Sequence, residues 1–234
     1  MKLSVLVPAR DEAATLAAIV ARVRATRLVH EIIVVDDGST DPTPALLKTL
    51  AAGDPPLMSL RHPVGRGKGA AIRTALAAAT GDVVLVQDAD LEYDPADYAA
   101  LLAPFFDPAV QAVYGSRNLR AGNGRSTFAF YWGGRGLSWL ANLLYDAQLT
   151  DVTTGYKAVR TPLLRSLGLA SDGFEFCPEL TARLRRRGVV IHEVPISYRP
   201  RSRAEGKKIR VRDGLIAIQT LIRLRFGRLR QPGR

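Results

Sequence analysis

The sequence predicts an α/β protein in which helices cover both faces of a mostly parallel β-sheet. In the first half, short apolar runs typical of strands alternate with helix-like segments, and the loops between them are short. After one acidic residue each, the runs 31–35 and 82–86 contain only Val, Ile and Leu, which is typical of strands buried on both faces. Polar clusters follow directly after three of the runs. Because ligands bind at the carboxyl edge of such sheets, this arrangement indicates an enzyme.

The expected elements follow in chain order. The first strand, 3–7, ends at Pro8, and an amphipathic helix runs from Asp11 to about Thr26. The apolar face of this helix consists of Leu16, Ile19, Val20 and Val23. Further strands are expected at 31–35, 57–61, 82–86, 109–115 and 189–194, with a short one after the polar loop 151–157. Further helices are expected at 43–52, 70–80, 95–103, 126–148, 178–187 and 211–225.

Length and composition fit one large globular domain with a basic appendage. The chain has 234 residues and is 47% hydrophobic, which is ordinary for a protein with a full core. Cys177 has no second cysteine with which to form a disulfide and is expected to be a buried small residue. No stretch approaches the roughly 20 apolar residues that span a bilayer. The N-terminal apolar run is too short for a signal peptide, so a soluble or peripheral protein is expected.

The net charge of +11 is concentrated near the C-terminus. Residues 199–234 carry twelve Lys or Arg against two acidic side chains, whereas residues 1–198 carry 21 basic against 20 acidic. We therefore divide the chain into a domain at 1–210 and a basic amphipathic helix and tail at 211–234. Such a tail indicates an anionic partner: nucleic acid, acidic lipid or a phosphorylated substrate. In its helix, apolar residues alternate with arginines. This pattern suits an anionic lipid surface, and it suits equally well packing on the core or on a second subunit.

The acidic residues after the fourth strand are the main candidate for a metal site. Asp88, Asp90 and Glu92 occupy alternate positions, so in an extended chain they face the same side. Three neighbouring carboxylates repel one another unless a cation lies between them, and oxygen ligands suit Mg²⁺ or Mn²⁺. A polar turn in which an Asp caps the next helix is the alternative.

Two common nucleotide-binding motifs are absent. The first strand–helix turn, 8–12, reads PARDE and not G-x-G-x-x-G, and Gly67-Lys68 lacks the first glycine and the Ser or Thr of a P-loop. The polar residues that follow the second and fourth strands suit a nucleotide sugar instead. Its base and ribose offer donors to Asp36 or Asp37 after the second strand, and its diphosphate offers ligands to a metal.

Four of these segments resemble family 2 glycosyltransferases with a GT-A fold. They are VPARDE at 7–12, VVDDGSTD at 34–41, GKGAAI at 67–72 and QDADLEYDP at 87–95. Later segments narrow the resemblance to the polyprenyl-phosphate sugar transferases, the group of dolichol-phosphate mannosyltransferase and its bacterial relatives. They are YGSR at 114–117, DVTTGYK at 151–157, GFEF at 173–176 and EVPI at 193–196. The resemblance implies a metal-dependent, inverting enzyme that moves a hexose from GDP-mannose or UDP-glucose to polyprenyl phosphate.

The same resemblance implies roles for individual residues. Asp88 and Asp90 would hold Mg²⁺ or Mn²⁺ on the donor diphosphate, with Glu92 at the position of a third ligand. The nucleotide pocket would be lined by Pro8, Arg10, Glu12, Asp36, Asp37, Lys68 and Asp88. The acceptor phosphate would meet Arg117, Arg135 and one of Arg201 and Arg203. A phosphate nucleophile is already ionised near neutral pH, so the catalytic set of Asp90 and these arginines needs no general base.

The implied partners are a nucleotide-sugar donor, a polyprenyl phosphate and an anionic membrane surface on the cytoplasmic side, with no nucleic acid. The aromatic helix around 128–145 and the basic helix 211–228 are the expected membrane contacts. One alternative is a family 2 transferase with a soluble acceptor. Another is a nucleic-acid or anionic-surface binding module that uses the sheet only as a scaffold, although such a module does not need three acids at a strand end.

Overall fold

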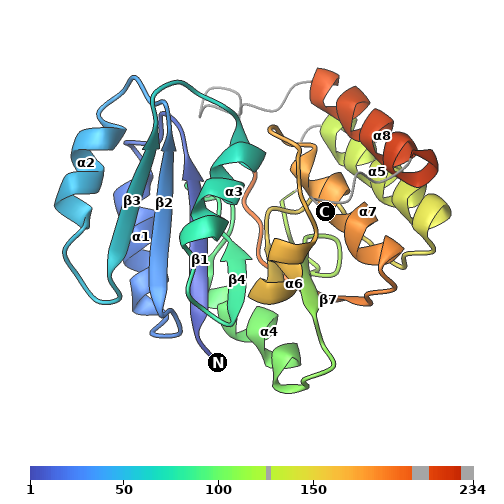
Figure 1. Ribbon diagram of the computed structural model, residues 1–234, viewed down its shortest axis with the longest axis horizontal. Coiled ribbons are helices and arrows are strands. Elements are labelled where there is room, and N and C mark those ends of the chain that lie inside the picture. Colours follow the sequence, from blue (N-terminus) through green and yellow to red (C-terminus); the bar gives the residue numbers. More distant parts are fainter. Residues whose placement is uncertain (125–127, 202–210, 228–234) are drawn as a thin grey trace.

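The computed structural model describes residues 1–124, 128–201 and 211–227, and in these residues seven strands form one sheet (Figure 1). The strands are β1 (Leu3–Ala9), β2 (Glu31–Asp37), β3 (Leu57–His62), β4 (Val83–Val86), β5 (Ala112–Ser116), β6 (Lys157–Arg160) and β7 (Ile191–Pro195). Their order across the sheet is β3-β2-β1-β4-β6-β5-β7. Neighbouring strands are parallel, except that β6 is antiparallel to β4 and β5. The expected mostly parallel sheet is confirmed.

Helices cover both faces of this sheet, which also confirms the expectation. Three helices contribute to one apolar cluster: α1 (Leu16–Ala25), α2 (Thr43–Leu50) and α4 (Tyr98–Leu102). The helices that contribute to the other are α3 (Lys68–Ala78), α5 (Phe128–Tyr145), α6 (Thr161–Ser166), α7 (Phe176–Arg186) and α8 (Val211–Phe226). Two 3₁₀ turns, η1 (Pro95–Asp97) and η2 (Ala103–Phe106), flank α4.

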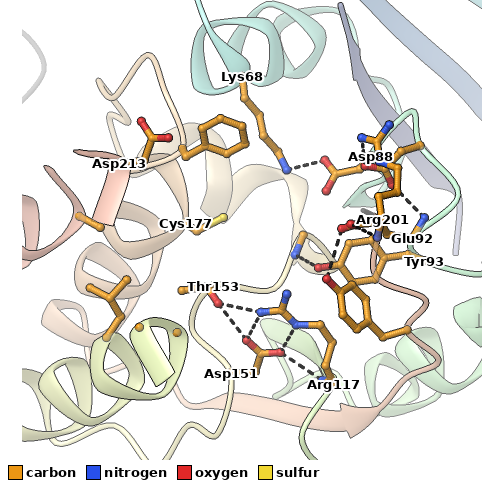
Figure 2. Close-up of a pocket in the computed structure, with 18 of the residues that line it drawn as sticks. Lys68, Asp88, Glu92, Tyr93, Arg117, Asp151, Thr153, Cys177, Arg201 and Asp213 are labelled. Carbon is orange, nitrogen blue, oxygen red and sulfur yellow. Dashed lines mark hydrogen bonds and ion pairs between the residues drawn. The ribbon is translucent and has the colours of Figure 1, made fainter. Parts of the chain in front are cut away.

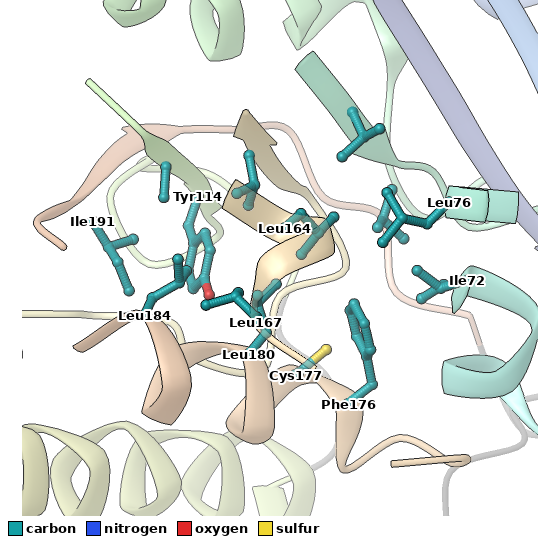
Figure 3. Packing of buried hydrophobic residues seen from close by; sticks show 14 of the residues in the cluster. Ile72, Leu76, Tyr114, Leu164, Leu167, Phe176, Cys177, Leu180, Leu184 and Ile191 are labelled. Atoms are coloured by element: carbon teal, nitrogen blue, oxygen red, sulfur yellow. The ribbon is translucent and has the colours of Figure 1, made fainter. Parts of the chain in front are cut away.

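The two clusters meet the sheet through alternate residues of each strand. In β4, Val83 and Leu85 belong to the cluster of α1, whereas Val84 and Val86 belong to the cluster of α3. This alternation arises because successive side chains of a strand point to opposite faces. Figure 3 shows part of the second cluster, where side chains from α3, α6 and α7 meet beneath the sheet. All four residues of β4 are buried, as expected for a strand covered on both faces.

Several element boundaries differ from the expected ones. Helix α1 begins at Leu16, because Asp11 has a left-handed backbone (φ 50°) and its carboxylate accepts hydrogen bonds from the backbone of Thr40 and Asp41. The expected helix at 95–103 is divided into η1, α4 and the start of η2. Strand β5 begins at Ala112 and not at 109, and the short helix α6 was not expected.

Helix α8 packs on the body of the protein. It lies beside α5 and α7 (Figure 1), its Leu221 is fully buried, and the carbonyl of Leu221 accepts a hydrogen bond from the Tyr145 hydroxyl at 2.6 Å. Leu224 is buried as well, whereas four large apolar side chains of this helix are exposed: Leu215, Ile218, Ile222 and Phe226. Among the described helices, none is long and apolar enough to cross a membrane. The division of the chain at residue 210 stays a prediction.

Candidate active site

A cavity of about 1220 Å³ opens at the carboxyl edge of the parallel strands (Figure 2). Most of the residues predicted for the site line it: Pro8, Arg10, Glu12, Asp37, Lys68, Asp88, Asp90, Glu92, Arg117, Arg135 and Arg201. Arg203 lies outside the described residues. The structure thus brings together loops after β1, β4 and β5 with residues from α3, α5 and α8.

The acidic residues after β4 are paired with cations of the protein itself. Lys68 Nζ forms an ion pair with Asp88 Oδ1, and Arg201 Nη2 lies 2.5 Å from Asp90 Oδ2. The Nη1 atom of the same guanidinium lies 3.2 Å from Glu12 Oε2. Burial raises the pKa of Asp90 to about 7, the charge of Asp88 adds to this rise, and Arg201 opposes it. This end of the cavity therefore concentrates negative charge that needs a cation beside it.

Glu92 does not have the expected extended arrangement. Strand β4 ends at Val86, and the N–H of Glu92 donates to Asp90 Oδ1 at 3.0 Å, so the chain turns at this point. The Glu92 carboxylate accepts the N–H of Arg201 at 2.7 Å and lies 3.5 Å from the Tyr198 hydroxyl. The expectation of three acids alternating along an extended strand is therefore wrong. In the described part of the chain, no group of three or more acidic, His or Cys side chains is arranged to hold a metal ion.

Asp88 and Asp90 nevertheless fit a hard divalent ion as a pair. Both line the cavity, both offer the oxygen ligands that Mg²⁺ and Mn²⁺ prefer, and each already holds a positively charged side chain. An ion held by the two carboxylates would take over the neutralisation that Lys68 and Arg201 provide in this structure. Metal binding by Asp88 and Asp90, the identity of the ion, and the role of Glu92 as a further ligand stay predictions.

The two neighbouring aspartates at the end of β2 have different surroundings. Asp36 is 1% exposed and does not line the cavity. Its carboxylate accepts the N–H of Ser39 at 2.9 Å and lies 3.2 Å from Arg61 Nε. Successive side chains of a strand point to opposite sides, which separates Asp36 from Asp37. The contact of Asp36 with a nucleotide stays a prediction, and this geometry does not support it.

Asp37 holds the loop before α3. It accepts the N–H groups of Arg66 and Gly67 at 2.8 and 2.7 Å, and its Oδ1 lies 2.7 Å from Nδ1 of the buried His62. Burial opposes its charge, but these hydrogen bonds keep the pKa of Asp37 below its ordinary value. Gly67 has a φ of +105°, and a Cβ there would lie 2.4 Å from a backbone oxygen, so only glycine fits. Asp37 thereby places Lys68, the first residue of α3, against the cavity.

Arg117 is held in the cavity wall by partners that sequence reasoning missed (Figure 2). Its Nε and Nη2 lie 2.6 and 2.7 Å from the two carboxylate oxygens of Asp151, and Nη2 donates to Thr153 Oγ1 at 2.7 Å. The guanidinium also lies 5.1 Å from the centre of the Tyr198 ring. Burial disfavours the charged form, but Asp151 outweighs it and keeps the pKa of Arg117 well above its ordinary value. The motif at 151–157 was the available signal for Asp151 and Thr153.

Arg135 differs from Arg117 in having a free charge. It is exposed on α5, lines the same cavity, and forms no hydrogen bond or ion pair with any residue that the structure describes. Asp151 balances the charge of Arg117, so the positive charge of this part of the cavity comes from Arg135, and both guanidinium groups offer the donors that suit an anionic group.

One wall of the cavity is apolar and belongs to α5 and α8. Leu137 lines the cavity from α5, and Leu215, Ala217 and Ile218 line it from α8. Outside the cavity, the same two helices carry further exposed apolar side chains: Trp132, Trp139, Leu143, Ile222 and Phe226. Exposed apolar surface of this kind marks contact sites for lipid or protein. The cavity thus connects a charged end with an apolar surface.

Comparison with known proteins assigns the chain to a family. The model of glycosyl transferase family 2 matches residues 4–168. The chain is 35% identical over 222 residues to polyprenol monophosphomannose synthase of Mycolicibacterium smegmatis, a match that covers 88% of this chain and 82% of that protein. It is 31% identical over 218 residues to undecaprenyl-phosphate mannosyltransferase of Micrococcus luteus, covering 88% of this chain and 87% of that protein.

A solved structure shares the fold. The crystal structure of glucosyl-3-phosphoglycerate synthase from Mycobacterium tuberculosis, in complex with Mn²⁺, UDP and glucosyl-3-phosphoglycerate, matches with a TM-score of 0.73 at 25% identity. The match covers 96% of this chain and 80% of that chain. The expectation of a GT-A fold is confirmed, and the alternative of a non-enzymatic binding module is set aside. The chain belongs to glycosyltransferase family 2, and it is a glycosyltransferase.

Proposed function

We propose that this glycosyltransferase moves a hexose from a nucleotide sugar to a polyprenyl phosphate. The observation that carries the proposal is the cavity, in which acidic residues, two arginines and an apolar wall lie together. A polyprenyl phosphate is an anion joined to a long apolar chain, so it needs a positive site next to an apolar path. The two relatives are named polyprenol monophosphomannose synthase and undecaprenyl-phosphate mannosyltransferase, and both names support the same acceptor class.

The donor occupies the acidic end in this proposal. Asp88 and Asp90 hold Mg²⁺ or Mn²⁺, and a divalent ion there neutralises the charge that develops on the leaving nucleoside diphosphate. Lys68 is released from Asp88 and donates to a phosphate oxygen, which it reaches from the N-terminus of α3. Pro8, Arg10 and Glu12 form the adjoining wall for the nucleoside. GDP-mannose and UDP-glucose both fit this arrangement, and the two mannose-transferring relatives favour mannose.

The acceptor phosphate binds between the donor and the apolar wall. Arg117 and Arg135 orient it and neutralise its charge, so its oxygen attacks the anomeric carbon directly and inverts it. Arg201 lies on Asp90 and Glu12 in this structure, so its contact with the acceptor phosphate requires that it leave these acids when the donor binds. Arg203 stays a candidate for the same contact.

The exposed surface of α5 and α8 supports a peripheral position on an anionic membrane, on its cytoplasmic side. Trp139 and Leu143 of α5 are each 66% exposed, and the arginines at 212, 223 and 225 of α8 are exposed beside the apolar residues of that helix. Apolar side chains enter the lipid interface while arginines contact anionic head groups. A membrane bound in this way lies next to the apolar wall of the cavity, where the acceptor chain would enter.

Sugar transfer to two acceptors tests the proposal. We expect radiolabel from GDP-mannose or UDP-glucose, with Mn²⁺, to enter polyprenyl phosphate in phosphatidylglycerol-containing vesicles. Soluble 3-phosphoglycerate should accept little label. Arg135→Ala should raise the KM for the lipid acceptor, whereas Arg22→Ala, which changes an exposed arginine on α1, should have no effect. Label in 3-phosphoglycerate and none in the lipid would favour the soluble-acceptor alternative and overturn the proposal.

A further inference from the structure

Glu193 of β7 is a carboxylate that the proposed chemistry does not use. It does not line the cavity, and it forms no ion pair with the described residues. Its two oxygens accept three hydrogen bonds from one short segment. They come from the N–H of Thr150 at 2.7 Å, the hydroxyl of Thr150 at 2.9 Å and the N–H of Asp151 at 2.9 Å. Glu193 therefore fixes the backbone at the point where the loop towards β6 begins.

That loop carries the side chain that orients Arg117. The Asp151 carboxylate is 2% exposed and receives the backbone N–H of Arg117 at 3.1 Å as well as its Nε and Nη2 (Figure 2). The contacts with Asp151 and Thr153 use only Nε and Nη2, and they set the direction of the whole guanidinium, including its Nη1 nitrogen. A displacement of Asp151 would therefore turn this nitrogen away from its present direction.

The chain on both sides of Arg117, at the end of β5, is tied to the same segment. The hydroxyl of Ser116 lies 2.6 Å from the Thr150 hydroxyl, and the Asn118 side chain donates to the Thr150 carbonyl at 2.8 Å. Both neighbours of Arg117 in the chain thus contact Thr150, whose N–H and hydroxyl bind Glu193. The contacts form one connected path from Glu193 to Arg117 that stays outside the donor end.

The chemistry of this path requires a carboxylate at position 193. All three groups that contact Glu193 donate a hydrogen bond to it, and only an acid offers acceptors on both oxygens. A glutamine of the same size replaces one of the two oxygens by an NH₂ group, so at least one of the part-buried N–H groups of Thr150 and Asp151 loses its acceptor and faces another donor.

We infer that Glu193 is a positioning residue for the acceptor phosphate, acting through Asp151 on the direction of Arg117. The inference rests on the proposed function, because it assigns the acceptor phosphate to Arg117. Under this inference, a residue of β7 affects binding of the acceptor without contacting the acidic end of the cavity, where the donor binds.

The change Glu193→Gln should raise the KM for polyprenyl phosphate roughly ten- to a hundredfold, with kcat at saturating acceptor little changed. Donor affinity, measured as the Kd for UDP or GDP with Mn²⁺, should stay the same. The matched control is His192→Gln on the adjacent, exposed position of β7, which should alter neither constant. Thr150→Val removes the hydroxyl contacts with Glu193 and Ser116 but keeps the two backbone N–H contacts with Glu193, so it should raise the acceptor KM less. Thr150→Ser, which keeps a hydroxyl, should restore the KM.

A double-mutant cycle with Arg117→Ala separates this inference from a general structural effect. If Glu193 acts through Arg117, the change Glu193→Gln should add nothing to the KM of the Arg117→Ala enzyme. Additive effects, an equal loss of donor affinity, or an unchanged KM in the folded Glu193→Gln and Thr150→Val proteins would overturn the inference. An acceptor KM that Arg117→Ala leaves unchanged would instead overturn the proposed role of Arg117, and the inference with it.

Discussion

Replacing Lys68 by Met should strengthen the binding of Mn²⁺ alone and weaken the binding of the nucleotide. In the ligand-free protein the Lys68 ammonium pairs with Asp88 Oδ1, and the two side chains are only 14% and 20% exposed. A metal ion that binds Asp88 must displace this ammonium. Met fills the same space without a charge, so the competition disappears while the packing near Phe174 remains.

The size of both effects follows from the contact that is lost. A hydrogen bond to a charged group contributes about 1.5–3 kcal/mol, and about 1.4 kcal/mol is a factor of ten in Kd. The Kd for Mn²⁺ alone should therefore fall about ten- to 150-fold in Lys68→Met. The nucleoside diphosphate loses the contact that we propose for Lys68, so its Kd should rise by a comparable factor. Opposite signs for the two ligands cannot result from a general loss of folding.

Isothermal titration calorimetry measures both constants. Mn²⁺ is titrated alone, and UDP or GDP is titrated at saturating Mn²⁺, into wild type and Lys68→Met. The control is Lys48→Met, which removes an exposed lysine of α2. A folded Lys68→Met protein that binds Mn²⁺ no more tightly than wild type would refute the reasoning.

Three further predictions concern other parts of the molecule. Gly155→Ala places a Cβ 2.4 Å from Asp88 Oδ2, so transfer should fall roughly tenfold or more while circular dichroism shows a folded protein. Burial lowers the pKa of Lys157 from 10.5 to about 8. The unfolded chain therefore binds more protons between these values, and the free energy of unfolding should rise there by up to about 1.4 kcal/mol per pH unit in urea denaturation. Trp139→Ser with Leu143→Ser changes two side chains that are each 66% exposed, so flotation with anionic vesicles should decrease at an unchanged Tm.

Each of these predictions has an outcome that contradicts it. Full transfer activity in Gly155→Ala would show that the position of the Asp88 carboxylate does not matter for the reaction. A rise of stability from pH 8 to 9.5 that persists in Lys157→Met would assign the effect to another group. Unchanged flotation of the Trp139→Ser, Leu143→Ser protein would remove α5 from the membrane contact.

The sheet and its carboxyl edge could be predicted because they depend on local patterns. The apolar run of β4 marks a strand buried on both faces, and the acids that follow it must lie at the edge where the other parallel strands end. The prediction for Glu92 assumed that the strand continued. Asp90 instead accepts the N–H of Glu92, which turns the chain. Asp and Asn often form such a turn, and the sequence does not show where one replaces a strand.

The partners of the site residues could not be predicted, because they are distant in the chain. Asp151 is 34 residues from Arg117, and Arg201 is 111 residues from Asp90, and only the folded sheet brings them together. The sequence could have predicted that Asp36 and Asp37 point in different directions. Adjacent side chains at a strand end point to opposite sides, so one of the two was bound to face away from the cavity.

The claim that Asp88 and Asp90 hold the leaving group through a metal ion is tested most directly by anomalous diffraction from a crystal with Mn²⁺ and a nucleoside diphosphate. The account predicts a manganese peak between the two carboxylates, in contact with the diphosphate, with Lys68 and Arg201 moved off these acids. A bound nucleotide with Lys68 still on Asp88, Arg201 still on Asp90 and no manganese beside them would contradict it.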